Sequence, residues 1–189
     1  MIEQATNRNN TFEFVVIDFR RQKFSICGSE IVEDDVVARA LKEISEKFMK
    51  KKNKQFGMYK SVTDEHTPFD AMKITHKVKR LYIDKYALKC ELEFLDTEEG
   101  NKILMLLENG YEIEPYFDPY NQRLNITGAD NLIPFDSNLK DLMRHVLGNY
   151  ESVRAVEDFE RQYKHDHIDQ LWMMSNNGVQ TLNYRNMFS

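Results

Sequence analysis

The amino-acid sequence predicts an α+β fold with an antiparallel sheet, and three observations support this prediction. Residues 72–79 and 86–94 alternate apolar and polar side chains, which is the period of a half-buried strand. Residues 34–51 and 96–110 instead repeat apolar residues every three or four positions, which is the period of a helix. Beyond residue 138, helical periods and a polar tail replace the strand patterns. We therefore expect a mixed domain followed by a C-terminal helical extension.

Composition narrows the class of protein. The chain has 189 residues, of which 41% are hydrophobic and 30% charged, a balance typical of a globular domain rather than a disordered chain. The polar N-terminus and the lack of a long apolar run favour an intracellular protein that makes no membrane contact. The net charge of -5 makes nucleic acid an unexpected partner. Cys27 and Cys90 are expected to be reduced core thiols, and neither has metal-ligand spacing, so no metal or cofactor is expected.

The first half of the chain contains a polar arm, three strands and one helix. Residues 11–19 and 23–27 have strand composition, and the RRQ between them suits a hairpin turn. Acidic residues open the helix at 34–51 and lysines close it, which complements the helix dipole. The basic run 50–54 is therefore expected to be a solvated helix end. A short strand at 55–62 and a loop at 63–70 follow.

The second half begins with the two long strands, whose polar faces carry lysines on one and glutamates on the other. This pattern favours antiparallel neighbours with opposite-charge pairs. The next helix has Asp96 or Thr97 as its N-cap and Asn109-Gly110 as its C-cap signal. The remaining expected elements are a stiff loop over 111–120, a strand over 122–133 that stops before Pro134, and helices over 138–148 and 151–174.

Three stretches resemble the prohead (capsid maturation) proteases of tailed bacteriophages. They are SEIVEDDVVARALKEI (29–44), KVKRLYIDKYALKCELEFLDTEEGNKILMLLENGYEI (77–113) and NITGADNLIPFDS (125–137). The resemblance covers residues 12–137 and implies a barrel-like antiparallel sheet with flanking helices. It divides the chain into an N-terminal arm (1–11), a protease-like domain (12–137) and a C-terminal helical extension with its tail (138–189).

The resemblance also implies a catalytic serine and histidine, but neither stands at its expected position. Ser61 lies about where the family has its histidine. The positions for the nucleophile are Glu114, Pro115, Tyr116 and Phe117, and the proline also removes a backbone N–H that an oxyanion site would need. The chain is therefore expected to be a catalytically degenerate relative.

A displaced catalytic dyad is the alternative, drawn from Ser61, His66 and His76. His66 lies in a loop and has a second interpretation as an exposed histidine. His76 is on the apolar face of its strand, where the pattern favours a hydrogen-bonded core or groove histidine over a catalytic base. Ser61 lacks a Gly-x-Ser-x-Gly context.

Two further clusters of polar residues have mainly structural interpretations. The histidines of HDH (165–167) are two residues apart, so on a helix they point away from each other and do not form a metal site. An acidic group could act as paired carboxylates or form a solvated loop; it comprises Glu112, Glu114, Asp118 and Asp130.

Aromatic residues mark two candidate contact surfaces. The segment EPYFDPY combines stiff prolines with aromatic rings, which suits either partner contact or packing back onto the sheet. Near the C-terminus, large apolar residues present the same choice. The candidate partner-contact residues are Pro115, Tyr116, Phe117, Pro119, Tyr120, Trp172 and Met173.

From the resemblance we expect a non-catalytic structural or assembly protein of a tailed-phage particle, found in the virion and, during assembly, in the host cytoplasm. Its expected partners are other phage structural proteins, in homo- or hetero-oligomers. An active maturation protease with a displaced dyad is the first alternative. A small host-directed binding protein is the second. The three differ in whether the chain cleaves a substrate and whether it remains in the particle.

Overall fold

The computed structural model describes residues 9–25, 31–61, 66–129 and 138–176, with side chains of the last helix described up to residue 165. The strands are β1 (Thr11–Asp18), β2 (Phe56–Met58), β3 (Ile74–Asp84), β4 (Ala87–Phe94), β5 (Ile113–Asp118) and β6 (Arg123–Gly128). The helices are α1 (Asp34–Lys50), α2 (Glu98–Glu108), α3 (Leu139–Leu147) and α4 (Asn149–Asn176), with 3-10 turns η1 (Lys52–Gln55) and η3 (Ala71–Lys73). These elements confirm the predicted α+β class and its antiparallel strands.

The strands β1, β4, β3 and β2 form one antiparallel sheet in that order. Strands β3 and β4 are neighbours, as the charge pattern predicted. Lys79 Nζ lies 3.4 Å from Glu93 Oε2, and Arg80 lies 3.9 Å from Glu91. These exposed pairs contribute little energy each, but they favour the observed register over a shifted one.

Strands β5 and β6 form a second sheet, so within the described residues the strands do not close into a barrel. This corrects the barrel-like sheet that the resemblance implied. The two sheets meet at one parallel bridge between Tyr59 and Ile126. Pairing beyond it is interrupted because the side chain of Asn125, rather than the β6 backbone, accepts the Met58 N–H at 3.1 Å.

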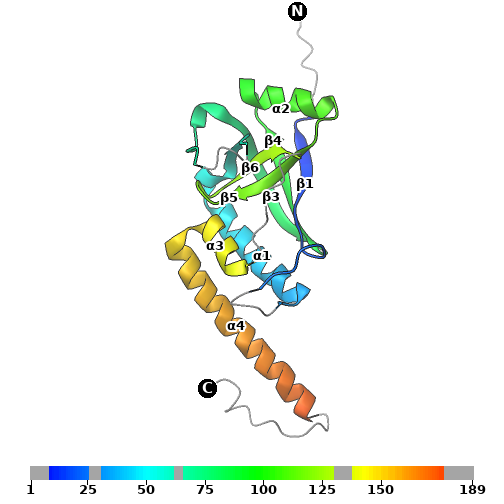
Figure 1. Ribbon diagram of the computed structural model, residues 1–189, viewed down its shortest axis with the longest axis vertical. Coiled ribbons are helices and arrows are strands. Elements are labelled where there is room, and N and C mark those ends of the chain that lie inside the picture. Colours follow the sequence, from blue (N-terminus) through cyan, green and yellow to red (C-terminus); the bar gives the residue numbers. More distant parts are fainter. Residues whose placement is uncertain (1–8, 26–30, 62–65, 130–137, 177–189) are drawn as a thin grey trace, which may run out of the picture.

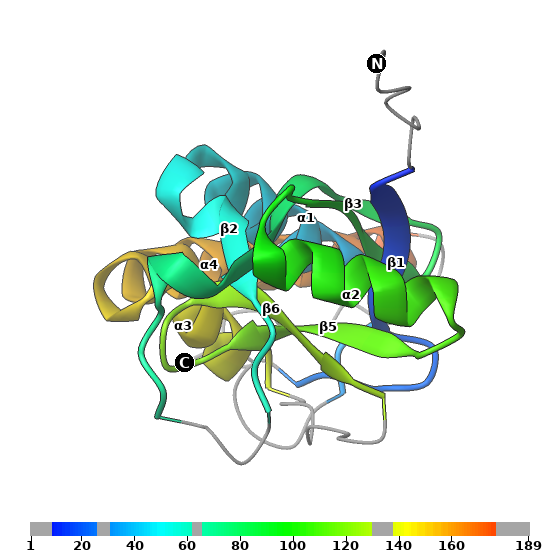
Figure 2. The same ribbon diagram turned by 90° about the horizontal axis from the view of Figure 1, so that it is seen from above.

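Helix α1 covers the sheet and supplies much of the core. It packs against β3 and β4, while α3 packs against α1 and β5 (Figure 1). Helix α2 lies at the opposite end of the molecule, over the strands when seen from above (Figure 2). The buried apolar residues of α1 lie at the predicted helical spacing: Val36, Val37, Ala40, Leu41, Ile44 and Phe48.

One predicted strand segment is wrong, and another begins later than predicted. Around residues 23–27, Ser25 makes only isolated bridges with Ile31 and Asn138, so RRQ is a turn without a hairpin; Cys27 lies outside the described residues. The first long strand begins at Ile74, because Met72 lies in η3 and is 88% exposed. The Asp70 side chain accepts the Met72 N–H at 2.9 Å, and this local capping bond favours the turn over an extended backbone.

The segment expected as a stiff loop is strand β5. Ile113, Pro115 and Phe117 are buried and Glu114 is exposed, so the strand period is present. Pro115 and Pro119 led to the prediction of a loop, because proline cannot donate a hydrogen bond to a strand ladder and usually argues against a strand. Strand β5 tolerates Pro115 because it pairs on one side only, with β6.

The C-terminal extension forms two helices joined at Gly148, whose φ of 85° favours glycine. Helix α4 begins at residue 149 and ends at 176, slightly longer than the predicted 151–174. Its second half extends past the other elements of the molecule (Figure 1). Of the helices that the structure describes, none has the length and apolar character required to cross a membrane.

Candidate functional site

The structure places the three candidate catalytic residues in different environments. Ser61 follows β2 and is half-buried, and residues 62–65 after it lie outside the described residues. His66 is exposed, and its ring contacts Tyr120 edge-to-face with centroids 5.6 Å apart. His76 lies in β3 and is completely buried.

The hydrogen bonds of His76 define its chemical state. Its Nε2 lies 2.9 Å from the Leu124 carbonyl oxygen, and its Nδ1 lies 2.7 Å from the Thr75 hydroxyl. A carbonyl only accepts, so Nε2 carries the proton and Nδ1 accepts from Thr75. Burial lowers the pKa of His76 to about 4, against a smaller opposing effect of the Leu124 bond. The imidazole is therefore neutral near pH 7, and both of its nitrogens have partners.

Gly57 explains how the imidazole fits between β2 and β6. A Cβ at this position would overlap His76 Nε2 and the Leu124 carbonyl oxygen. The histidine thus fills the space left by a missing side chain and joins β3 to β6. This environment is that of a structural core histidine.

A buried ion pair that the sequence did not predict lies at the junction of the two sheets. Lys60 Nζ is 2.7 Å from Asp118 Oδ2, and the two side chains are only 3% and 2% exposed. Asp118 Oδ2 also accepts from Asn125 Nδ2 at 3.0 Å, and Oδ1 accepts the Tyr120 N–H at 2.9 Å. The Lys60 N–H donates to the Ile126 carbonyl at 2.9 Å. The pair therefore ties the chain after β2 to both strands of the second sheet.

This network corrects the solvated-loop interpretation of Asp118. Glu112 and Glu114 are exposed as expected, whereas Asp130 lies outside the described residues. The sequence gives one local sign of the network, the polar residue Asn125 between Leu124 and Ile126 of β6. In the structure Asn125 is buried as fully as these two apolar neighbours. In chemical terms the lysine and carboxylate neutralise each other, which fits a structural role better than proton transfer.

The candidate partner-contact residues divide into two groups. Pro115 and Phe117 are buried, and the Phe117 ring packs against Phe48 of α1 with centroids 5.8 Å apart. Tyr116 is half-buried. Pro119 and Tyr120 are exposed, with Tyr120 53% exposed. Pro115 and Phe117 therefore belong to the core, whereas Pro119 and Tyr120 lie on the surface, where a partner could contact them.

The other contact candidates, Trp172 and Met173, lie in the last turns of α4. Their side chains are outside the described part of the chain, as are those of Asp166 and His167 from the HDH motif. Among the described residues, no group of three or more His, Cys, Asp or Glu side chains could hold a metal ion. Cys90 is a free thiol in the core, and burial raises its pKa, so it remains protonated.

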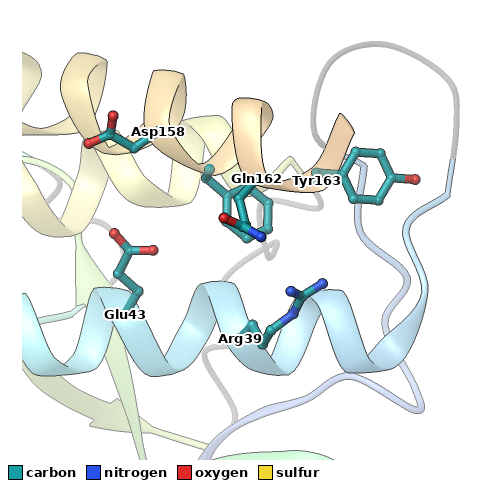
Figure 3. A pocket seen from close by; sticks show the side chains of 6 residues that line it. Arg39, Glu43, Asp158, Gln162 and Tyr163 are labelled. Atoms are coloured by element: carbon teal, nitrogen blue, oxygen red, sulfur yellow. The ribbon is translucent and has the colours of Figure 1, made fainter. Parts of the chain in front are cut away.

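Helices α1 and α4 enclose a shallow cleft of about 270 Å³. In Figure 3, Arg39 and Glu43 point from α1 toward α4, and Asp158 and Gln162 lie opposite them. Phe159 and Tyr163 complete the lining. This volume lies just under the lower end of the range for small-molecule sites, about 300–1,000 Å³.

These features together describe a folded domain with a structural histidine, a structural ion pair and a projecting helix. Searches of protein-family models, curated proteins and solved structures found no match for this chain.

Proposed function

We propose that this chain is a non-catalytic structural or assembly protein of a tailed-phage particle, built on a degenerate relative of the prohead protease fold. The link to phage rests on the resemblance of the three sequence stretches. The loss of catalysis is supported by residues 114–117, which contain no serine and lie in β5. The projecting α4 supports a binding role, because it offers surface beyond the body of the domain (Figure 1).

The observation that carries the proposal is the environment of His76. A serine nucleophile needs an imidazole within hydrogen-bond reach that can accept its proton. The accepting nitrogen of His76 already receives the Thr75 hydroxyl, and its N–H is held by Leu124. Opening this site would leave buried polar groups of β3 and β6 without partners, at a cost of about 1–3 kcal/mol each.

Labelling with a fluorophosphonate probe tests the absence of catalysis. We expect no covalent label on the purified full-length chain under conditions in which a known serine hydrolase is labelled to completion. Label on Ser61, lost in Ser61→Ala, would replace the proposal with the displaced-dyad protease. Label that persists in the Ser61→Ala variant would lie on a nucleophile other than Ser61.

Quantitative mass spectrometry of purified mature particles tests the assembly role. We expect the intact chain at a copy number that matches a symmetric particle component. Presence in infected cells together with absence from both particles and assembly intermediates would contradict the proposal. That result would favour the host-directed binding protein.

A further inference from the structure

Helix α4 has two chemically different sides. One side packs on the domain through Ser152, Ala155, Val156 and Phe159, all of which are buried. The opposite side carries large apolar residues in solvent, with Tyr150 88% and Val153 59% exposed. Tyr150 also lines a cleft with Lys47, Lys50 and Lys51 of α1, so it lies at the edge of this exposed side.

The helical period extends this side along the whole of α4. At about 100° per residue, residues three, four or seven positions apart share a face. The face of Tyr150 and Val153 therefore continues through charged positions to two apolar positions near the end of the helix. We define the outer face of α4 as Tyr150, Val153, Glu157, Glu160, Arg161 and Lys164, together with positions 168 and 171. These last two positions follow from the helical period alone, because the side chains of Ile168 and Leu171 lie outside the described part of the chain.

The outer face is complementary to itself in the antiparallel direction. A twofold axis that passes between Glu160 and Arg161 exchanges these two residues, which have opposite charges. The same axis places Glu157 of one helix opposite Lys164 of the other. Beyond the charges, it exchanges Tyr150 with Leu171 and Val153 with Ile168, so apolar positions meet apolar positions.

The parallel arrangement lacks this complementarity. It would place Glu157 against Glu157 and Lys164 against Lys164, and like charges in direct opposition are destabilising. The antiparallel contact also fits the shape of the molecule. The body of the domain occupies the side of α4 away from the outer face, and the second half of α4 extends past the body (Figure 1).

We propose that a second copy of this chain packs antiparallel along the outer face of α4, forming a twofold-symmetric dimer. The contact would run from Tyr150 to Leu171, about 33 Å of helix. This inference deepens the proposed function, because it names the partner of the projecting helix. A twofold contact of this kind is isologous, the commonest closed arrangement in homo-oligomers.

A charge-exchange experiment tests the pairing. Sedimentation equilibrium of the full chain, from micromolar to hundreds of micromolar, should show a monomer–dimer equilibrium that weakens with added salt. Lys164→Glu and Glu157→Lys should each weaken the dimer at least about tenfold, because symmetry places each new like-charge pair in the interface twice. The double variant Glu157→Lys/Lys164→Glu should restore dimerisation to within about threefold of the original chain, because the exchanged charges attract again.

Orientation is tested with single cysteines and a short bis-maleimide cross-linker. Arg161→Cys lies next to the twofold axis, so this variant should cross-link to its own copy. Val153→Cys should not, because its counterpart lies far along the partner helix. The unsubstituted chain, which carries Cys27 and Cys90, provides the background, and circular dichroism checks that each variant retains its helices.

Three results would overturn the inference: a monomer at every concentration, a dimer that neither single charge reversal weakens, or equal cross-linking at positions 153 and 161. Failure here is distinguishable from failure of the proposed function. A monomer that carries no hydrolase label and remains in particles contradicts only the self-association, whereas labelling of Ser61 contradicts only the non-catalytic role.

Discussion

At the scale of single residues, the most informative feature is the ion pair of Lys60 and Asp118. Burying two charges costs several kcal/mol of desolvation each, which their attraction offsets only when the remaining hydrogen bonds are made. Asn125 and the Tyr120 N–H supply such bonds to the carboxylate. The pair therefore specifies how the two sheets meet more than it adds net stability.

Removing one partner of this ion pair should lower the free energy of unfolding by more than the net contribution of the pair. Lys60→Met leaves a buried carboxylate without its cation, and we expect a loss of about 3–5 kcal/mol in the free energy of unfolding. Asp118→Asn should have a comparable effect. The double variant should cost less than the two single changes added together, by about 1–3 kcal/mol. Urea denaturation measures all three, and strictly additive losses would contradict a coupled pair.

His76 should make stability depend on pH. Its pKa is about 4 in the folded chain, below the ordinary value of 6.5, so the unfolded chain takes up the proton first as the pH falls. The contribution of neutral His76, about 3 kcal/mol, is complete above pH 6.5 and is lost as the pH falls to about 4.

The comparison of the original chain with His76→Gln isolates this effect from that of the carboxylates. The variant should be less stable at pH 7, yet its free energy of unfolding should fall less steeply between pH 6.5 and 4. If the assigned His76 imidazole titrates near pH 6.5 in the NMR spectrum of the folded chain, the site is open to water.

At the scale of elements, β5 shows how local sequence rules can mislead. Its proline, Pro115, usually argues against a strand, yet its buried alternation is that of a strand. The partner strand β6 provides the missing constraint, pairing with it from Ile113 opposite Gly128 to Asp118 opposite Arg123. The aromatic residues of this segment therefore have different roles according to the side on which they lie.

Substitutions in and after β5 should separate these roles. Phe117→Ala removes a core ring that packs on Phe48, so we expect a loss of about 3–5 kcal/mol. Tyr120→Ala removes an exposed ring and should cost less than about 1 kcal/mol. Thermal unfolding followed by circular dichroism measures both. Equal losses would mean that Tyr120 is also part of the core.

At the scale of the whole molecule, the C-terminal extension shares the core of the domain. Leu142, Met143 and Val146 of α3 and Phe159 of α4 belong to the same buried cluster as the residues of α1 and the sheet. The extension was expected as a separate segment of sequence, and this shared core ties its first half to the sheet. Only the second half of α4 extends past the body (Figure 1).

The shared core predicts a single cooperative unfolding transition. Calorimetric and van't Hoff enthalpies should agree for the full chain. Met143→Ala should destabilise this one transition by about 2–5 kcal/mol, because it leaves a cavity in the shared core. Two resolved transitions, of which only the first moves in the variant, would show that α3 and α4 unfold on their own.

Local patterns in the sequence were enough to predict several elements. Helices α1 and α2 and the hairpin of β3 and β4 follow from periods of 3.6 and 2, because each period reflects one face toward the core. Thr97 was correctly named as a candidate N-cap, and its hydroxyl accepts the Gly100 N–H at 3.0 Å. The lack of a serine over residues 114–117 is likewise visible in the sequence alone.

The features that join distant segments follow from the packing of the whole fold. Lys60 and Asp118 are 58 residues apart, and His76 and Leu124 are 48 apart, so no local period brings them together. Their burial depends on Gly57 leaving room for an imidazole and on Asn125 interrupting the pairing of β2 with β6. The open junction of the two sheets, the neutral histidine and the strand character of β5 all result from this packing. Such contacts depend on how segments far apart in the sequence pack around each residue. The neighbours of a residue along the chain do not specify this packing.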